Sequence, residues 1–175
     1  MDKIITERIY LRPIQLDDTE LIVKWRNTSY VQNNFIFREK FTSEMHKKWM
    51  KTKVNTGEVI QYIICELNDR PIGSVYFRDI DTKDKSAEFG IFIGEENAIG
   101  KGYGKEATSA FVKYGFDSLG LEKIFLRVIY SNKRATHVYE KVGFRKIYEE
   151  KEKLYPSNEE VNVVFMKIDR KHVIS

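Results

Sequence analysis

The chain has 175 residues, 42% of them hydrophobic and 32% charged, with a formal net charge of +4. This composition is typical of one globular domain, which we expect to span residues 1–175, and it excludes a disordered chain. Lysines and glutamates alternate along the sequence without a basic block, so no nucleic-acid partner is expected. No apolar run approaches membrane-spanning length and no signal-peptide core is visible, which predicts a cytoplasmic protein without a membrane partner.

Cysteine and histidine usage points to neither a redox nor a metal site. The one cysteine, Cys65, lies in an apolar run and is interpreted as a buried thiol in a reducing compartment. His46 and His172 are expected to face solvent, and His137 to lie on the polar side of a helix. No spacing of His, Cys, Asp and Glu is typical of a metal site, so no metal is expected.

The first third of the chain predicts one strand, two helices and a long loop. Alternating apolar residues favour a strand, acidic or hydroxyl residues favour helix starts, and the polar stretch between the helices lacks periodicity. The expected elements are a strand over 4–14, a helix beginning at Asp17 or Asp18, a loop over 28–41, and a helix over 44–53 capped by Thr42 or Ser43.

The rest of the chain alternates strands with two further helices. Turn residues separate the segments, Asn132 is placed to cap the second of these helices, and Gly143 to end it. Strands are expected over 58–67, 72–80, 87–94, 123–130, 144–152 and 161–167, with helices over about 103–119 and 132–143. The order predicts an α+β fold, a mixed sheet of about seven strands flanked by four helices.

A glycine-rich turn connects the strand at 87–94 to the following helix. Its sequence from Ile99 to Ala107 is Ile-Gly-Lys-Gly-Tyr-Gly-Lys-Glu-Ala. Glycines let the backbone approach an anion closely, and the helix start adds free N–H groups and the positive end of the helix dipole. The spacing matches neither the dinucleotide fingerprint nor a P-loop. The turn therefore indicates phosphate binding, with a plain flexible turn as the alternative.

Two spaced motifs resemble those of the GNAT acyl-CoA N-acetyltransferases. Gly102 and Gly104 match the pyrophosphate loop of that family, while Ile99 replaces its leading Gln or Arg, as in the RimJ/RimL-like branch. The stretch from Asn132 to Phe144 resembles the second signature, Asn-x-x-Ala-x-x-x-Tyr-x-Lys-x-Gly-Phe. The resemblance implies the GNAT fold, with a mostly antiparallel, twisted sheet. It also implies acetyl-CoA as co-substrate and direct attack by an amine in a ternary complex.

The resemblance also suggests roles for individual residues. Tyr139 would protonate the departing thiolate, although its helical spacing equally suits a core aromatic. Glu88 would serve as the base, directly or through water, with a substrate anchor or a strand-edge charge as alternatives. A backbone N–H of Phe92 or Ile93 would stabilise the oxyanion. The expected cofactor-binding residues are Phe92, Ile93, Ile99, Gly100, Lys101, Gly102, Tyr103, Gly104, Lys105, Asn132 and Arg134.

The acceptor is expected beside the first two helices and their loop. The residues predicted to bind it are Trp25, Arg26, Tyr30, Phe35 and Arg38, although Trp25 also suits the core. Basic residues outnumber Glu39 and Glu44 in this segment, which favours a small amine on an anionic carrier such as an amino-sugar nucleotide. A protein N-terminus, a polyamine and a non-catalytic CoA-binding module remain alternatives. Either a monomer or a homodimer is expected.

Overall fold

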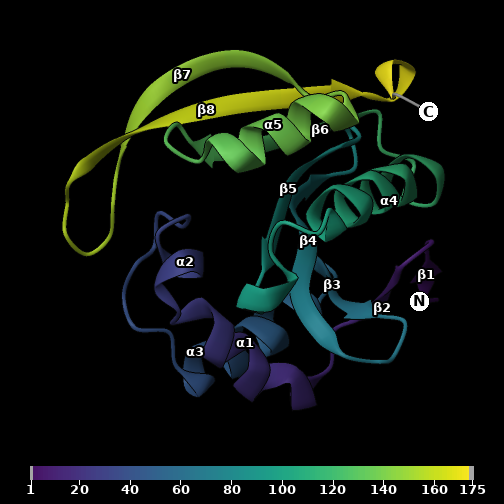
Figure 1. The fold of residues 1–175 in the computed structure, drawn as a ribbon. Coiled ribbons are helices and arrows are strands. Elements are labelled where there is room, and N and C mark those ends of the chain that lie inside the picture. The colour runs from purple at the N-terminus through teal and green to yellow at the C-terminus, as the bar shows by residue number, and fades with distance from the viewer. Residues whose placement is uncertain (1, 174–175) are drawn as a thin grey trace.

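The computed structural model describes residues 2–173, which form an eight-stranded sheet with helices on both faces (Figure 1). The strand order is β1-β2-β3-β4-β5-β6-β8-β7, and every neighbouring pair is antiparallel except β5 and β6. The strands are β1 (Ile4–Ile5), β2 (Ile9–Pro13), β3 (Ile60–Glu66), β4 (Pro71–Asp81), β5 (Ser86–Ile93), β6 (Lys123–Ile129), β7 (Arg145–Lys153) and β8 (Glu160–Asp169). The mixed, mostly antiparallel sheet is confirmed.

The helices fall into two groups. The helices near the N-terminus are α1 (Thr19–Arg26), α2 (Ser29–Gln32) and α3 (Ser43–Trp49), which continues as a π-helical turn over Met50–Val54. The later helices are α4 (Tyr103–Asp117) and α5 (Lys133–Val142), and short 3₁₀ turns cover Leu16–Asp18, Glu96–Ala98 and Arg170–His172. None of the described helices is both long and apolar enough to cross a membrane.

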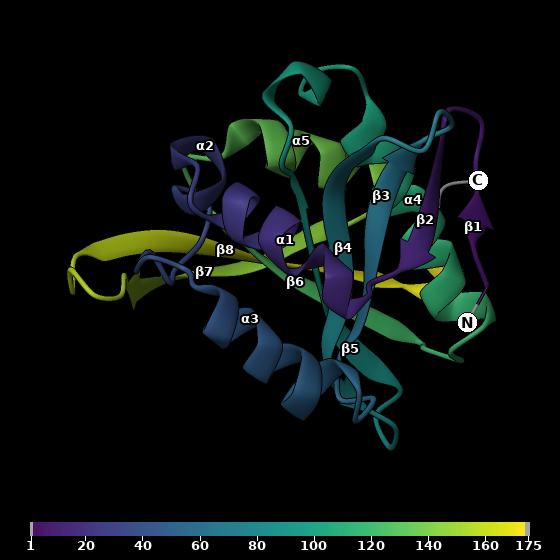
Figure 2. The same ribbon diagram turned by 90° about the horizontal axis from the view of Figure 1, so that it is seen from below.

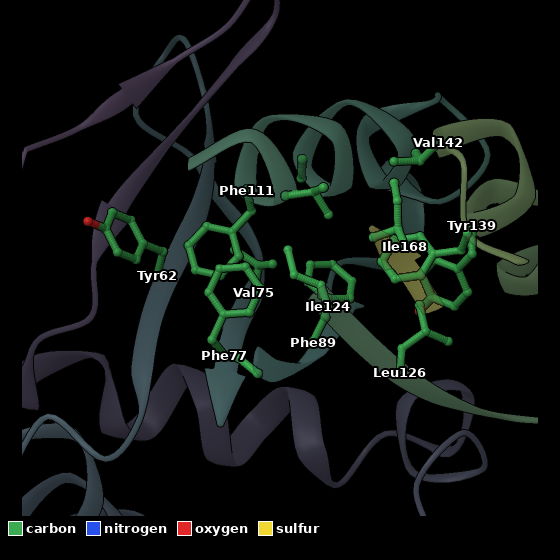
Figure 3. Close-up of a cluster of buried hydrophobic side chains, with 14 of the residues drawn as sticks. Tyr62, Val75, Phe77, Phe89, Phe111, Ile124, Leu126, Tyr139, Val142 and Ile168 are labelled. Atoms are coloured by element: carbon green, nitrogen blue, oxygen red, sulfur yellow. The ribbon is translucent and has the colours of Figure 1, made fainter. Parts of the chain in front are cut away.

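Strands β2 and β3 are buried on both faces because each helix group packs on a different side of the sheet. Tyr62 and Ile64 belong to the larger core cluster, which also contains Phe111 of α4 and Tyr139 of α5 (Figure 3). Ile63 and Cys65 belong to a second cluster with residues of α1. Because successive side chains of β3 enter opposite core clusters, the residues from Tyr62 to Cys65 form a continuous apolar run. The buried thiol of Cys65 is confirmed.

The sheet opens between β5 and β6. Their parallel pairing covers only Ser86 to Glu88 against Lys123 to Phe125, although the two strands continue to Ile93 and Ile129. Beyond Glu88 the two strands therefore diverge, and backbone groups on the facing edge of β5 are left without a strand partner. This opening connects the two faces of the sheet.

A long hairpin formed by β7 and β8 extends past α5 toward the N-terminal helices (Figures 1 and 2). Its end meets the loop that follows α2. The N–H of Tyr155 donates to Ile36 O at 3.0 Å, and the N–H of Arg38 donates to Tyr155 O at 2.7 Å. The ring of Phe37 stacks on that of Tyr155 at a centroid distance of 5.3 Å. The end of the hairpin thus holds the loop after α2 in place.

Three predictions about the elements need correction. The expected strand over 4–14 is two strands, because Thr6 to Arg8 turn and β1 pairs back on β2. The expected loop over 28–41 contains the short helix α2. His46 was expected to face solvent, but it is only 1% exposed and its Nδ1 lies 2.9 Å from Thr19 Oγ1.

Candidate active site

A pocket of about 970 Å³ passes through the opening between β5 and β6. Phe89 and Ile93 line it from the face of the sheet that carries α4 and α5, and Glu88 and Phe92 line it from the other face. Because side chains alternate along a strand, β5 contributes to both halves. The pocket can therefore bring together two ligands that approach from opposite faces.

The glycine-rich turn lies at the start of α4. Gly100 and Gly102 have φ values of 81° and 84°, a left-handed conformation that disfavours side chains with a Cβ. The helix begins at Tyr103, and the first N–H groups of a helix have no partner within it. These donors and the helix dipole make the turn suitable for phosphate. The turn therefore fits the pyrophosphate of CoA.

A side-chain network fixes this turn to the start of the sheet. Arg8 donates through Nη1 to Lys101 O and through Nε to Glu106 Oε2, both at 2.8 Å. The backbone N–H of Arg8 and the hydroxyl of Thr6 donate to Glu106 Oε1. These contacts hold the turn in place before any ligand binds, which lowers the ordering cost of binding. Arg8 could not be recognised from sequence, because its partner Glu106 lies 98 residues away in the chain.

Backbone direction distinguishes between the two residues predicted to stabilise the oxyanion. The N–H of Gly94 donates to Ile72 O of β4 at 2.7 Å. Because N–H groups alternate along a strand, the N–H of Phe92 points to β4, where Phe92 pairs with Ser74. The N–H of Ile93 then points into the opening toward β6. Ile93 is the better placed of the two.

Tyr139 lies where the pocket meets the larger core cluster (Figure 3). Its ring packs against Phe89 and Phe144 at centroid distances of 6.2 and 5.9 Å. Burial, with a smaller contribution from Tyr76, raises the pKa of the Tyr139 hydroxyl. The phenol therefore keeps its proton at neutral pH, which suits a proton donor.

Glu88 is held by two arginines that the sequence analysis did not identify. Its Oε1 accepts from Arg78 Nη2 at 3.0 Å and from Arg127 Nε at 2.9 Å. Burial opposes ionisation, but the two arginines outweigh it and lower the pKa of Glu88. Arg78 lies directly opposite Glu88 in the β4–β5 register, a pairing that only strand alignment could have indicated. A lowered pKa weakens Glu88 as a base and favours the alternative role of an anchor.

Several predicted acceptor residues gather on the face of the sheet that carries α1. Arg26, Tyr30 and Phe35 line the pocket, and the guanidinium carbon of Arg26 lies 3.8 Å from the centroid of Phe35. The hydroxyl of Tyr30 donates to Gly94 O, which ties α2 to the end of β5. Tyr76 of β4 also lines this half, and its ring lies so close to Gly90 that a Cβ there would meet Cζ at 2.3 Å.

Other predicted residues lie elsewhere. Trp25 is fully buried in the second core cluster, and its indole N–H donates to Glu95 Oε1 at 2.8 Å, so the prediction of a substrate contact is wrong and the alternative of a core residue holds. Arg38 does not line the pocket, because its guanidinium bonds to Asn33 O and Phe35 O. Lys101 and Lys105 are exposed beside the glycine-rich turn. At the same turn, the guanidinium of Arg8 lies over the ring of Tyr103.

The second predicted motif has the expected local geometry. Asn132 Oδ1 accepts from the N–H of Ala135 at 3.3 Å, which confirms the cap of α5. Gly143 ends the helix with a φ of 118°. Asn132 and Arg134 line the pocket together with Ile99 and Gly104. The two motifs thus border one cavity. Within residues 2–173, no group of acidic, histidine and cysteine side chains is arranged to hold a metal ion.

The chain is similar in sequence to several known proteins. The chain is 28% identical over 142 residues to spermidine N(1)-acetyltransferase of Vibrio cholerae, covering 80% of each protein. It is 30% identical over 138 residues to acetyltransferase PseH of Campylobacter jejuni, covering 79% of this chain and 83% of that protein. A 29% identical match to the uncharacterized protein MJ1062 of Methanocaldococcus jannaschii covers 79% of this chain but only 28% of that longer protein.

The fold and the family model lead to the same conclusion. The crystal structure of spermidine N-acetyltransferase from Vibrio cholerae superposes with a TM-score of 0.87 at 22% identity, covering 94% of this chain and 96% of that one, which establishes the fold. A family model described as "Acetyltransferase (GNAT) domain" matches residues 8–145. The chain therefore belongs to the GNAT acetyltransferases and is an acetyl-CoA-dependent N-acetyltransferase.

Proposed function

We propose that this enzyme, as a RimJ/RimL-like member of the family, acetylates a compact primary amine on an acceptor with negative charge, such as an amino-sugar nucleotide. The supporting observation is the charge of the pocket. Glu88 is the only carboxylate among the lining residues, and it already pairs with two arginines. The lining cations are Arg26, Arg78, Arg127 and Arg134.

This balance of charge disfavours a polyamine acceptor. A polyamine carries several positive charges, and moving them out of water without matching carboxylates leaves a large desolvation cost. Glu39 and Glu44, the acidic residues expected near the acceptor, are not among the lining residues. The names of the spermidine acetyltransferases among the relatives therefore do not decide the acceptor of this chain. An anionic acceptor would be attracted by the arginines instead.

The pocket residues suggest how the amine is held. Glu88 Oε1 takes both arginine hydrogen bonds, and no donor among residues 2–173 bonds to Oε2. Oε2 is therefore free to accept an N–H of the amine. We assign Glu88 as an anchor that orients the attacking amine. The amine then loses its proton to water.

Acetyl-CoA supplies an activated acyl group, and we propose that two groups of this chain assist its transfer. The N–H of Ile93 points into the opening, where it would donate to the oxyanion that forms on attack. The hydroxyl of Tyr139 would donate its proton to the departing thiolate. The first N–H groups of α4 and the turn at Gly100 and Gly102 would hold the pyrophosphate.

A panel of acceptors tests this proposal. Thiol release from acetyl-CoA is measured with a UDP-linked 4-amino sugar, spermidine, and a peptide with a free N-terminus. We expect the highest kcat/KM for the sugar nucleotide. Spermidine or the peptide as the best substrate would overturn the proposed acceptor. CoA binding in a calorimetric titration without thiol release from any amine would instead favour the non-catalytic CoA-binding module.

A further inference from the structure

The buried polar groups that lack partners gather at the pocket. Within residues 2–173, three buried side-chain nitrogen atoms have no hydrogen-bond partner: Arg26 Nε, His46 Nε2 and Arg78 Nε. All three residues line the pocket. Buried polar groups in proteins are almost always paired, because leaving one unpaired costs the full desolvation penalty. The unmet hydrogen-bonding capacity therefore indicates that a polar ligand group binds there.

Arg26 is the clearest case. Its guanidinium carbon lies 3.8 Å from the centroid of Phe35 and 4.6 Å from that of Phe41. Burial lowers the pKa of Arg26, an effect that Tyr76 partly opposes and the positive charge of Arg78 reinforces. No carboxylate in the described residues forms an ion pair with it, whereas Arg12, another half-buried arginine, pairs with Asp18 at 2.7 Å. The two rings contact the side chain but offer its N–H groups no acceptor.

His46 does not add a second cation to this region. Thr19 Oγ1 donates to Leu16 O at 2.6 Å, so it accepts from His46 at 2.9 Å, and Nδ1 carries the hydrogen. Burial lowers the pKa of His46, which keeps the ring neutral and Nε2 unprotonated. The charge and the unpaired donors therefore belong to the arginines.

Arg78 connects this region to the amine anchor. Its Nη2 donates to Glu88 Oε1 at 3.0 Å, while its Nε lies 3.7 Å from Asp79 Oδ2, too far for a hydrogen bond. Arg78 thus contacts the carboxylate that would hold the amine, and it lines the same pocket as Arg26, the guanidinium that has no anion. An acceptor that carries both an amine and an anionic group would complement both groups.

We infer that Arg26, together with Arg78, forms a subsite for an oxyanion, a carboxylate or a phosphate group, carried by the acceptor amine. This inference rests on the proposed function and names the residues that recognise the charge. A guanidinium can donate two parallel hydrogen bonds to either group. Arg38, which was also predicted to bind the acceptor, takes no part because its guanidinium already donates to the backbone carbonyls of Phe35 and Asn33.

A binding measurement tests the subsite without depending on turnover. Inorganic phosphate, pyrophosphate and acetate are titrated calorimetrically into protein saturated with CoA, so that the phosphate positions of the cofactor are filled. We expect one of them to bind the parent, with a loss of about 10- to 100-fold in Arg26→Gln, the size of a hydrogen bond to a charged group. Phosphate or pyrophosphate binding identifies a phosphate subsite, and acetate binding identifies a carboxylate subsite.

Two further variants sharpen the result. Arg38→Gln should change oxyanion affinity less than about twofold, and Arg26→Lys should bind with intermediate affinity because it keeps the charge but loses the fork. Thermal unfolding shows that each variant is folded. Absence of oxyanion binding to the parent, or equal binding in parent and Arg26→Gln, overturns the inference. If Arg26-dependent binding is found but no anionic amine is acetylated, the subsite stands and the proposed acceptor fails.

Discussion

Tyr139 belongs both to the hydrophobic core and to the lining of the pocket. Its ring belongs to the larger core cluster, while the residue also lines the pocket. Within residues 2–173 its hydroxyl oxygen is not among the buried side-chain atoms that lack a hydrogen-bond partner, so it is open to the pocket. A hydroxyl that is open to the pocket can bond to water in the free enzyme, so its removal costs little folding stability. Tyr139 can therefore serve as a proton donor without being needed as a structural hydrogen bond.

Replacing Tyr139 with phenylalanine should separate these two roles. Tyr139→Phe keeps the ring packed against Phe89 and Phe144 and removes only the hydroxyl. We expect kcat to fall by about 10²- to 10⁴-fold, the usual contribution of a positioned acid. The free energy of unfolding should change by less than about 1 kcal/mol. Steady-state kinetics and urea unfolding measure the two effects.

Tyr62→Phe is the matched control. Tyr62 lies in the same core cluster, is fully buried, and does not line the pocket. Its hydroxyl bonds only weakly to Tyr114, at 3.5 Å. The control should keep the activity of the parent. An activity of Tyr139→Phe within a few-fold of the control would show that Tyr139 is a core aromatic and no acid.

At the scale of elements, the start of α4 combines a left-handed glycine turn with a helix end. Gly102 is the N-cap of α4 and adopts φ 84°, and a Cβ there would meet Arg8 Nη2 at 3.1 Å. The same Arg8 holds the carbonyl of Lys101. The backbone conformation and the network around it together orient the free N–H groups.

Gly102→Val should abolish CoA binding while leaving the protein folded. A β-branched residue at positive φ costs about 1–3 kcal/mol and would turn the N–H groups away from their present direction. Gly57→Val provides the control, because Gly57 has φ 79° in a distant turn with open space around it. Both variants should lose similar stability, but only Gly102→Val should lose CoA affinity in a calorimetric titration. Equal CoA affinity in the two variants would contradict the role of the turn.

At the scale of the whole molecule, one charged network joins residues from four strands across the opening of the sheet. Arg78 of β4 bonds to Glu88 of β5, which bonds to Arg127 of β6, and Arg127 Nη1 bonds to Glu152 of β7 at 3.0 Å. The network ties together β5 and β6 close to the last residues of their backbone pairing. It therefore stabilises the region from which the strands diverge.

The pH dependence of stability should report this network. The pKa of Glu88 is lowered in the folded protein, so its contribution is present above about pH 4.3, the unfolded value, and is lost as the pH falls through the folded value. Glu88→Gln should lower the free energy of unfolding by about 1–3 kcal/mol at pH 7. The difference between parent and variant should shrink below pH 4 in thermal scans.

Asp117→Asn is the control for this measurement. Asp117 pairs with Lys113 on the exposed side of α4, where solvent screens the pair. Because solvent screens the pair, its removal should leave the stability nearly unchanged at both pH 7 and below pH 4. A Glu88→Gln variant that behaves like Asp117→Asn, or whose deficit grows as the pH falls, would show that the network does not stabilise the fold.

Local features of this protein could be predicted from sequence because their causes lie within a few residues. The caps at Thr42 and Asn132 and the helix end at Gly143 follow from local hydrogen bonds and backbone freedom. The glycine-rich turn follows from the same physics. The β3–β4 hairpin and the order of elements follow from periodicity and turn residues, and the eighth strand was missed only because β1 has two residues.

The tertiary structure decided which side chains meet. Arg26 and Arg38 look equivalent in the sequence, but Arg26 of α1 lines the pocket. The guanidinium of Arg38 instead donates to two backbone carbonyls of the loop after α2. Glu88 could not be recognised as a paired carboxylate, because its partners Arg78 and Arg127 come from β4 and β6. Strand register, helix packing and the divergence of β5 from β6 join residues far apart in the chain, and no local pattern encodes those distances.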